Sequence, residues 1–185
     1  MRIYTKKGDD GSTGLLYGGR VPKNDPRTDV YGTLDEVVSC LGLARSAGLV
    51  PRVESIVIRV QRELFAVGAQ LATAPANQEK LQDGISKVSA EMTEALEADI
   101  DALLGVHPLP QEFILPGETS GSAALDLARS IVRRAERKAV AMDRSGELPD
   151  PEILRYLNRA SDLIFTLARH EEAERGRRAA PSRQR

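Results

Sequence analysis

The chain has 185 residues, of which 41% are hydrophobic and 29% charged, with a formal net charge of −1 at pH 7. That length suits one domain with a buried core, here taken as 1–185, and the near-zero charge excludes recruitment of nucleic acid by a global field. The sequence has no apolar run of about 20 residues, no signal-peptide pattern and a single cysteine. These features predict a cytoplasmic protein that does not bind membranes.

Residues 1–24 are rich in Gly, Lys and Asp without periodicity, which predicts a long N-terminal loop. Its segment 5–14 combines glycines, hydroxyls and lysines. Backbone N–H groups beside glycine can turn around an anion, and Lys23 adds a cation for a polyphosphate. Asp9 or Asp10 is a candidate ligand for Mg²⁺, which prefers oxygen. The loop is not a Walker A motif, and its composition alone fits a flexible polar leader equally well.

Five segments with helical spacing follow, because apolar residues recur in each at steps of three or four. We expect helices over the ranges 30–44, 51–71, 92–103, 120–142 and 151–167. Pro51 is a favoured first helical residue, and Thr119 or Ser120 is a plausible cap. The sequence therefore predicts an all-α antiparallel bundle, followed by a frayed or disordered polar tail over 175–185.

The fourth helical segment carries a dense group of charged residues: Arg129, Arg133, Arg134, Glu136 and Arg137. At about 100° per residue, Arg129, Arg133 and Glu136 fall on one narrow side of the helix, which flanks the apolar stripe. Arg137 lies at the border of that side, and Arg134 points away from it. Guanidinium groups match phosphate oxygens, and Glu136 can orient an arginine or accept from a ribose hydroxyl. A solvated face with internal ion pairs is the alternative interpretation.

The fifth helical segment places Asn158 and Phe165 on one side, next to its apolar stripe. Asn158 can hydrogen-bond a ligand or a helix backbone, and Phe165 can contact a planar ligand or belong to the core. His107 and His170 are expected to be isolated, because no His, Cys and Glu have the sequence spacing of metal ligands. The chemistry is therefore expected to depend on positioning and electrostatics, without a nucleophile from the protein.

Six blocks together resemble the PduO-type family of ATP:cob(I)alamin adenosyltransferases. In order they are YTKKGDDGST (4–13), RVPK (20–23), YGTLDE (31–36), FILPG (113–117), RRAER (133–137) and YLNRASDL (156–163). Each block alone is weak, but their order and spacing over most of the chain are specific. The sequence differs from the family's usual pattern at two places, both on the expected corrinoid side. Val37-Val38 replaces the usual Leu-Asn pair, and Glu118 stands where a second glycine is common.

The resemblance implies a five-helix, ferritin-like up-and-down bundle assembled as a homotrimer, with ATP between adjacent subunits. It implies that the triphosphate is wrapped by the N-terminal loop through Thr5, Lys6, Lys7, Gly8, Ser12, Thr13 and Lys23. The family's other ATP-binding positions match Arg133, Arg134, Glu136, Arg137 and Asn158. Asp35 and Arg129 match a pair that bridges subunits beside the active site. Phe113 matches an aromatic that displaces the lower axial ligand of the corrinoid.

The resemblance also implies the reaction, in which Co(I) of cobalamin or a related corrinoid attacks C5′ of ATP and releases triphosphate with the help of Mg²⁺. Co(I) is itself a strong nucleophile, so the protein's tasks are to align two reactants and to stabilise a leaving polyanion. An adenosylcobalamin-dependent enzyme or a reductase is an expected partner. The alternatives are a module that binds ATP and delivers corrinoid without catalysis, and a helical scaffold without a nucleotide site.

Overall fold

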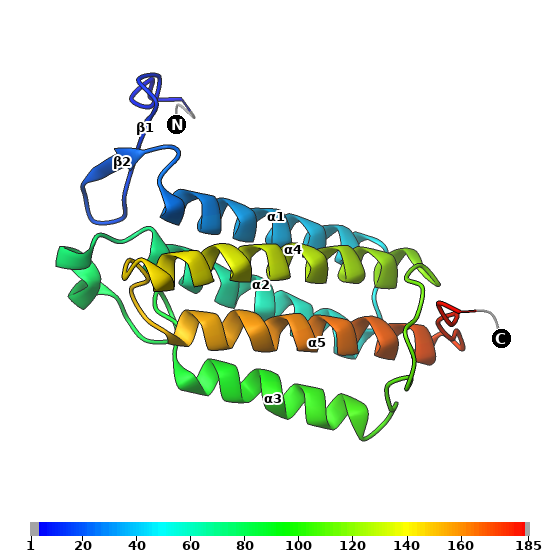
Figure 1. Ribbon diagram of the computed structural model, residues 1–185. Coiled ribbons are helices and arrows are strands. Elements are labelled where there is room, and N and C mark those ends of the chain that lie inside the picture. Colours follow the sequence, from blue (N-terminus) through cyan, green and yellow to red (C-terminus); the bar gives the residue numbers. More distant parts are fainter. Residues whose placement is uncertain (1–3, 184–185) are drawn as a thin grey trace.

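The computed structural model describes residues 4–183, and within that range the chain is mostly helical (Figure 1). Its elements are β1 (Ser12–Gly14), β2 (Arg20–Pro22), α1 (Pro26–Ser46), α2 (Pro51–Leu71), the 3₁₀ helix η1 (Pro75–Lys80), α3 (Ala90–Leu104), α4 (Ser120–Arg144) and α5 (Glu152–Glu174). The predicted helical bundle is confirmed. The β1–β2 hairpin lies inside the segment that was expected to be a loop, and η1 lies inside the connection between the second and third helices. The start of that loop, residues 1–3, lies outside the described residues.

Local capping explains where the helices begin. Asp25 accepts a hydrogen bond from the backbone N–H of Arg27, so α1 starts at Pro26, four residues before the apolar stripe. At α4, the Thr119 hydroxyl accepts from the N–H of Ser122 at 2.9 Å, and the Ser122 side chain accepts from the N–H of Thr119. Of the two candidates from the sequence, Thr119 is therefore the cap.

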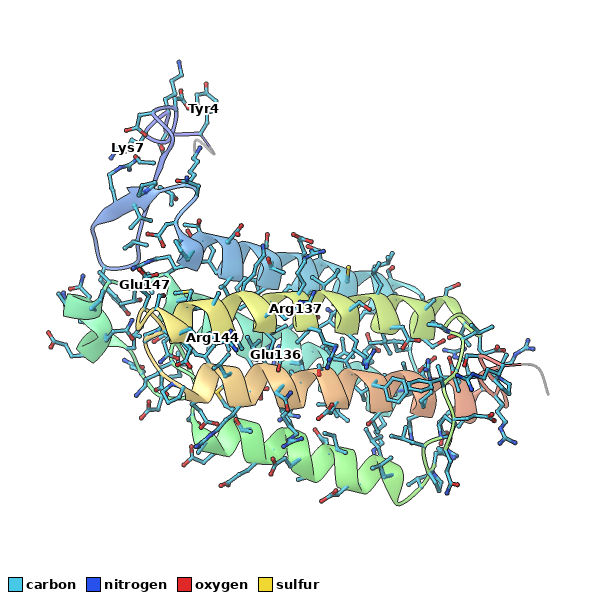
Figure 2. The ribbon with its side chains drawn as sticks, in the orientation of Figure 1. Tyr4, Lys7, Glu136, Arg137, Arg144 and Glu147 are labelled. Carbon is cyan, nitrogen blue, oxygen red and sulfur yellow. The ribbon has the colours of Figure 1, made fainter. Side chains whose placement is uncertain are left out.

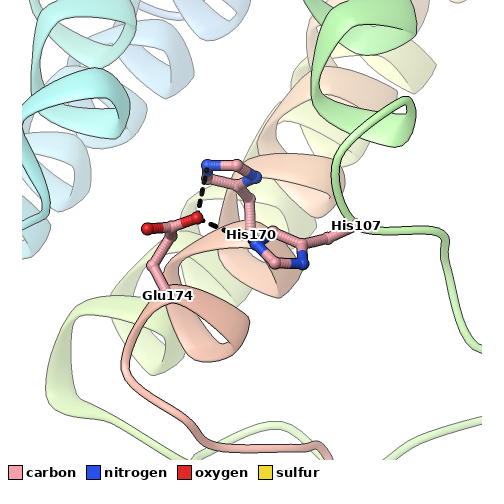
Figure 3. A group of neighbouring side chains, drawn as sticks. All are labelled: His107, His170 and Glu174. Atoms are coloured by element: carbon pink, nitrogen blue, oxygen red, sulfur yellow. Dashed lines mark hydrogen bonds and ion pairs between the residues drawn. The ribbon is translucent and has the colours of Figure 1, made fainter.

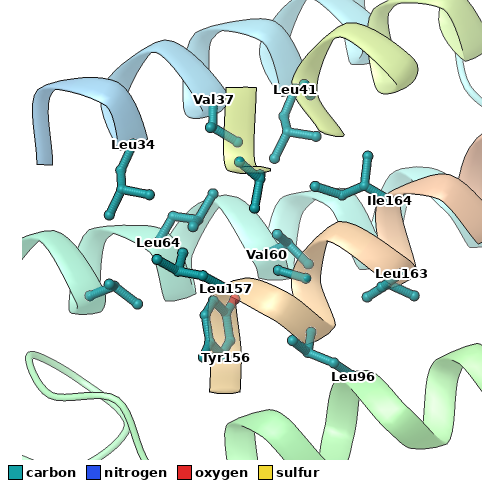
Figure 4. Packing of buried hydrophobic residues seen from close by; sticks show 14 of the residues in the cluster. Leu34, Val37, Leu41, Val60, Leu64, Leu96, Tyr156, Leu157, Leu163 and Ile164 are labelled. Atoms are coloured by element: carbon teal, nitrogen blue, oxygen red, sulfur yellow. The ribbon is translucent and has the colours of Figure 1, made fainter. Parts of the chain in front are cut away.

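The helices pack side by side, with α4 between α1 and α5, α2 against α1 and α5, and α3 on the outer side of α5 (Figure 1). Leucine, valine and isoleucine side chains of α1, α2 and α5 meet in the core around Tyr156 (Figure 4). On α4 the small residues Ala128, Ala135 and Ala139 are fully buried, which lets neighbouring helices approach closely. None of the described helices combines the length and apolar character needed to cross a bilayer.

The segment after α5 returns along the connection between α3 and α4. The N–H of Leu115 donates to the carbonyl of Ala180 at 2.8 Å, and the N–H of Ser182 donates to the carbonyl of Phe113 at 2.8 Å. Ile114 and Pro181 form an isolated antiparallel bridge between these two bonds. The expectation of a frayed tail does not hold for 180–182, because their backbone groups find partners in a distant connection. Residues 184–185 lie outside the described residues.

Candidate functional site

The N-terminal loop is folded around Arg20. Strands β1 and β2 pair with Thr13 opposite Val21, so Arg20 on β2 faces back toward the turn that precedes β1. Its Nε donates to Ser12 Oγ at 2.9 Å, and its Nη2 donates to the carbonyl of Lys7. Arg20 therefore stabilises the loop conformation, a role that sequence analysis missed.

Three of the predicted phosphate-binding residues lie together inside this loop. A Cβ atom on Gly8 would lie 3.3 Å from Nζ of Lys23 and 3.1 Å from the carbonyl oxygen of Ser12. Glycine at position 8 thus leaves room for the Lys23 side chain to fold over the loop. Thr5 and Lys7 are exposed. Lys7 lies near the tip of the loop, which projects from the end of the bundle (Figure 2).

The two candidate magnesium ligands differ in their surroundings. Asp10 accepts hydrogen bonds from the N–H and the hydroxyl of Ser12, at 2.9 and 2.7 Å, and these bonds lower the pKa of its carboxyl group. Arg20 lies 3.7 Å from the same oxygen of Asp10. Asp10 is therefore part of the loop's internal structure, whereas Asp9 remains exposed.

The charged residues of α4 divide between its two neighbouring helices. Toward α5, Glu136 accepts a hydrogen bond from Nδ2 of Asn158 at 3.0 Å, so these two predicted site residues are in contact. Toward α1, Arg134 pairs with Glu36. Arg134 was expected to point away from the side that carries Arg129, Arg133 and Glu136, and its neighbour on its own side of α4 is α1. Arg133 and Arg137 are exposed and form no ion pair with described residues.

Arg129 and Phe113 line a second part of the α4–α5 surface. A cavity of about 550 Å³ there is lined by Phe113, Ile114, Pro116, Asp126, Arg129 and Phe165, among others. The guanidinium of Arg129 lies 5.1 Å from the ring centroid of Phe165, and that of Arg169 lies 5.1 Å from the same ring. Phe113 is 86% exposed although it is aromatic, so its ring is available to a ligand.

The predicted site residues do not all meet within one chain. Among the described residues, no hydrogen bond or ion pair joins the loop 5–23 to the charged residues of α4 or to Asn158. Figure 2 shows Lys7 beyond the end of the bundle, whereas Glu136 and Arg137 lie along its side. Asp35 is exposed beside an apolar cavity of about 300 Å³ between α1 and α2, where it forms no ion pair with a described residue.

The two histidines were expected to be isolated, but in the structure they lie together with Glu174 (Figure 3). Nε2 of His107 lies 2.8 Å from Oε1 of Glu174, and the two imidazole ring centroids are 5.0 Å apart. The prediction failed because His107 belongs to the connection after α3, far from α5 in sequence. One signal was present, since His170 and Glu174 are four residues apart and so share a helix face.

Comparison with known proteins identifies close relatives over almost the whole chain. Residues 3–171 match the family model described as cobalamin adenosyltransferase. A corrinoid adenosyltransferase of Citrobacter freundii is 39% identical over 171 residues, covering 92% of this chain and 95% of the relative. A corrinoid adenosyltransferase of Bacillus subtilis is 40% identical over 181 residues, covering 95% and 89% of the two chains.

Solved structures give the same result. A variant PduO-type ATP:corrinoid adenosyltransferase from Lactobacillus reuteri, complexed with cobalamin and ATP, superimposes with a TM-score of 0.87. Its sequence is 34% identical, and the match covers 99% of this chain and 97% of that one. The fold of this chain is therefore similar to that of this protein.

Proposed function

Because this chain belongs to the cobalamin adenosyltransferase family, we propose that it transfers the 5′-deoxyadenosyl group of ATP to Co(I) of a corrinoid and releases triphosphate. The observation that carries the proposal is the α4–α5 surface. The exposed guanidinium groups of Arg133 and Arg137 lie there beside the Asn158–Glu136 hydrogen bond. Guanidinium groups can donate two parallel hydrogen bonds to a phosphate, and the neighbouring polar pair can bind a ribose hydroxyl, so this surface suits a nucleotide.

We propose that each nucleotide site combines the loop of one subunit with α4 of its neighbour in a ferritin-like homotrimer. The separation of the loop from α4 within one chain supports this arrangement. The loop supplies Lys23 and the N–H groups around Gly8, and α4 supplies Arg133, Arg134 and Arg137. Mg²⁺ is the proposed counter-ion of the triphosphate, with exposed Asp9 as its candidate ligand.

The corrinoid is proposed to lie against the cavity that Phe113, Arg129 and Phe165 line. An exposed aromatic ring at its rim can occupy the space of the lower axial ligand and exclude water from that side of the cobalt. Lysine and arginine side chains hold the triphosphate in line and stabilise the charge that develops on it as the C5′–O bond breaks. No general base is needed, because the nucleophile is the cobalt itself.

The test is the absorbance change that accompanies adenosylation. Reduced cobalamin, ATP and Mg²⁺ are mixed with the protein, and the visible spectrum is followed with and without enzyme. Conversion at many equivalents of corrinoid per chain supports the proposal. A change limited to one equivalent indicates a module that binds and delivers corrinoid, and no ATP binding at millimolar concentration indicates a helical scaffold.

Asp35→Ala is expected to weaken assembly of the trimer. Asp35 is exposed beside Phe65, which is itself 63% exposed, so this side of α1 and α2 has the mixed apolar and charged character of a subunit interface. Sedimentation at decreasing protein concentration should show dissociation of the variant at a concentration at least about tenfold higher. For a trimer–monomer equilibrium this is about 100-fold in the dissociation constant, or about 2.8 kcal/mol per trimer. Asp162→Ala, which removes an exposed carboxylate that pairs with Arg159 on its own helix, is the control. The proposed bridge is an ion pair between Asp35 of one subunit and Arg129 of the next. It would be contradicted if Asp35→Ala dissociated at the same concentration as the unmodified protein and if the effects of Asp35→Ala and Arg129→Ala on assembly were simply additive.

Deletion of residues 177–185 is expected to lower kcat while leaving the KM for ATP nearly unchanged. The deletion removes both backbone hydrogen bonds that tie the Phe113 segment to the tail, so the ring is held less well against the corrinoid. Deletion of 184–185 alone keeps both bonds and should behave as the full chain. Steady-state kinetics with each substrate varied in turn makes the comparison, and equal kcat values in the two deletions would contradict it.

The cytoplasm is the proposed compartment, since the single free thiol of Cys40 fits a reducing environment. An enzyme that uses adenosylcobalamin or a reductase that supplies Co(I) is the proposed class of protein partner.

A further inference from the structure

The fold gathers both histidines of the chain at one point, at the end of the bundle where α3 and α5 finish (Figure 3). His170 and Glu174 lie one turn apart on α5, and His107 comes from the connection after α3. Two imidazoles and one carboxylate form the ligand set of many three-ligand zinc sites. Neither the nucleotide nor the corrinoid site proposed above uses any of the three residues.

Their spacing is close to that of ligands around one ion. Oε1 of Glu174 lies 2.8 Å from Nε2 of His107 and 3.8 Å from Nε2 of His170. One ligand atom from each residue lies within 4.8 Å of the others. Ligands that are bonded to zinc at about 2.0–2.2 Å in a tetrahedron lie about 3.4 Å apart. Side-chain shifts on the order of an ångström therefore convert this cluster into a coordination shell.

His170 is the residue whose position calls for an explanation. It is only 3% exposed, yet its ring makes no hydrogen bond with any described residue. Nδ1 is buried without a partner, and Nε2 lies 3.8 Å from Glu174, beyond hydrogen-bonding distance. Burial of the ring with so few polar contacts is costly, and a metal ion at Nε2 would add a strong interaction at that nitrogen, although not at Nδ1.

The surrounding charges favour an ion that is bound by nitrogen donors over one held by charge alone. Two of the three donor groups are imidazoles, which suit Zn²⁺ as ligands. Arg52 faces the same cavity and opposes a cation. Glu171 is already engaged by the N–H of Val50 and by Arg175. Hard cations such as Mg²⁺ and Ca²⁺ are therefore disfavoured relative to Zn²⁺.

We propose that His107, His170 and Glu174 bind Zn²⁺, with a water molecule completing the shell from the adjoining cavity. That cavity has a volume of about 310 Å³ and is lined by Val50, Pro51, Arg52, Val106, His170 and Glu174. The ion would link two segments: the start of the α3–α4 connection, which contains Phe113, and the end of α5. The tail that follows α5 returns to the same connection. The ion thus fixes the Phe113 segment at its base, in addition to the tail hydrogen bonds.

The test uses the full chain without an affinity tag and without nucleotide or corrinoid, and Co²⁺ serves as a spectroscopic substitute for Zn²⁺. We expect one ion per chain by calorimetry, visible d–d bands of four- or five-coordinate cobalt, and a rise in the melting temperature with added Zn²⁺. His107→Asn and Glu174→Gln should each weaken Zn²⁺ binding by at least about tenfold, since even loss of an outer-shell partner costs about 10–100-fold. Both side chains are partly exposed, so the variants are expected to fold.

Two controls separate this site from weak surface binding. Glu97→Gln removes an exposed carboxylate of α3 that pairs with Arg159, so it changes the net charge as Glu174→Gln does without touching the cluster. In the unmodified protein, ¹⁵N-histidine NMR should show both imidazoles shifting together as Zn²⁺ is added. The proposal is overturned if both histidine signals stay unchanged at millimolar Zn²⁺, or if His107→Asn binds the ion as tightly as the Glu97→Gln control.

Discussion

Arg133→Ala is expected to lower kcat for adenosyl transfer by about 10²–10³-fold, the usual cost of removing one donor that stabilises developing charge. In the proposed site, Arg133 of α4 contacts the triphosphate of ATP. Its side chain is exposed and forms no ion pair with described residues, so its loss is expected to cost the fold little. Alanine is also the best helix former, which keeps α4 intact.

The measurement is the rate of adenosylcobalamin formation at saturating ATP, together with the melting temperature of the variant. Arg155→Ala is the matched control, because Arg155 is an arginine of α5 whose side chain is 75% exposed and, among residues 4–183, pairs only with Glu152 of the same helix. We expect the control to retain the full rate. A rate for Arg133→Ala within a few-fold of this control would remove Arg133 from the nucleotide site.

Arg169→Met is expected to destabilise the protein by about 3–5 kcal/mol at pH 7, because it leaves two buried carboxylates without a counter-ion. Nη2 of Arg169 lies 2.6 Å from Asp126 and 2.9 Å from Glu172. All three side chains are less than 10% exposed. Nε also lies 2.9 Å from Glu172, but it is not directed along a hydrogen bond, so this contact acts through charge alone.

The loss of stability in Arg169→Met is expected to shrink as the pH falls from 7 toward 5. Burial already raises the pKa of Glu172 in the folded protein, and removal of the guanidinium raises it further. A carboxyl group whose pKa is higher when folded binds protons more tightly in the folded state, so stability is lost as pH rises through that pKa and is regained on acidification. Urea unfolding at both pH values measures the difference.

Arg159→Met is the matched control for this experiment. Arg159 also pairs with two carboxylates, Glu97 and Asp162, but these are half-exposed and solvent screens the interaction. Its replacement is expected to cost less than about 1 kcal/mol at either pH. If Arg169→Met were no less stable than this control, or if its loss did not depend on pH, the buried cluster would not stabilise the fold as argued.

Much of the charged surface of α4 could be predicted from helix geometry alone. The angular spacing places Arg129 and Glu136 beside the apolar stripe, and in the structure these residues contact Phe165 and Asn158 of α5. The partner of Arg134, which is Glu36 of α1, could not be predicted in the same way. A helical wheel gives directions around one axis, whereas the neighbour on each side depends on how the helices are arranged.

The sequence by itself determined the helices, narrowed the cap of α4 to two neighbouring residues and supplied the blocks that resemble the family, because each depends on residues within one or two turns of one another. Only the tertiary structure decided that His107 meets His170 and Glu174, that the tail holds the Phe113 segment, and that Arg20 folds the N-terminal loop. These contacts join segments whose separation in sequence carries no periodic signal. Their existence follows from which helix ends and connections the packed core brings together.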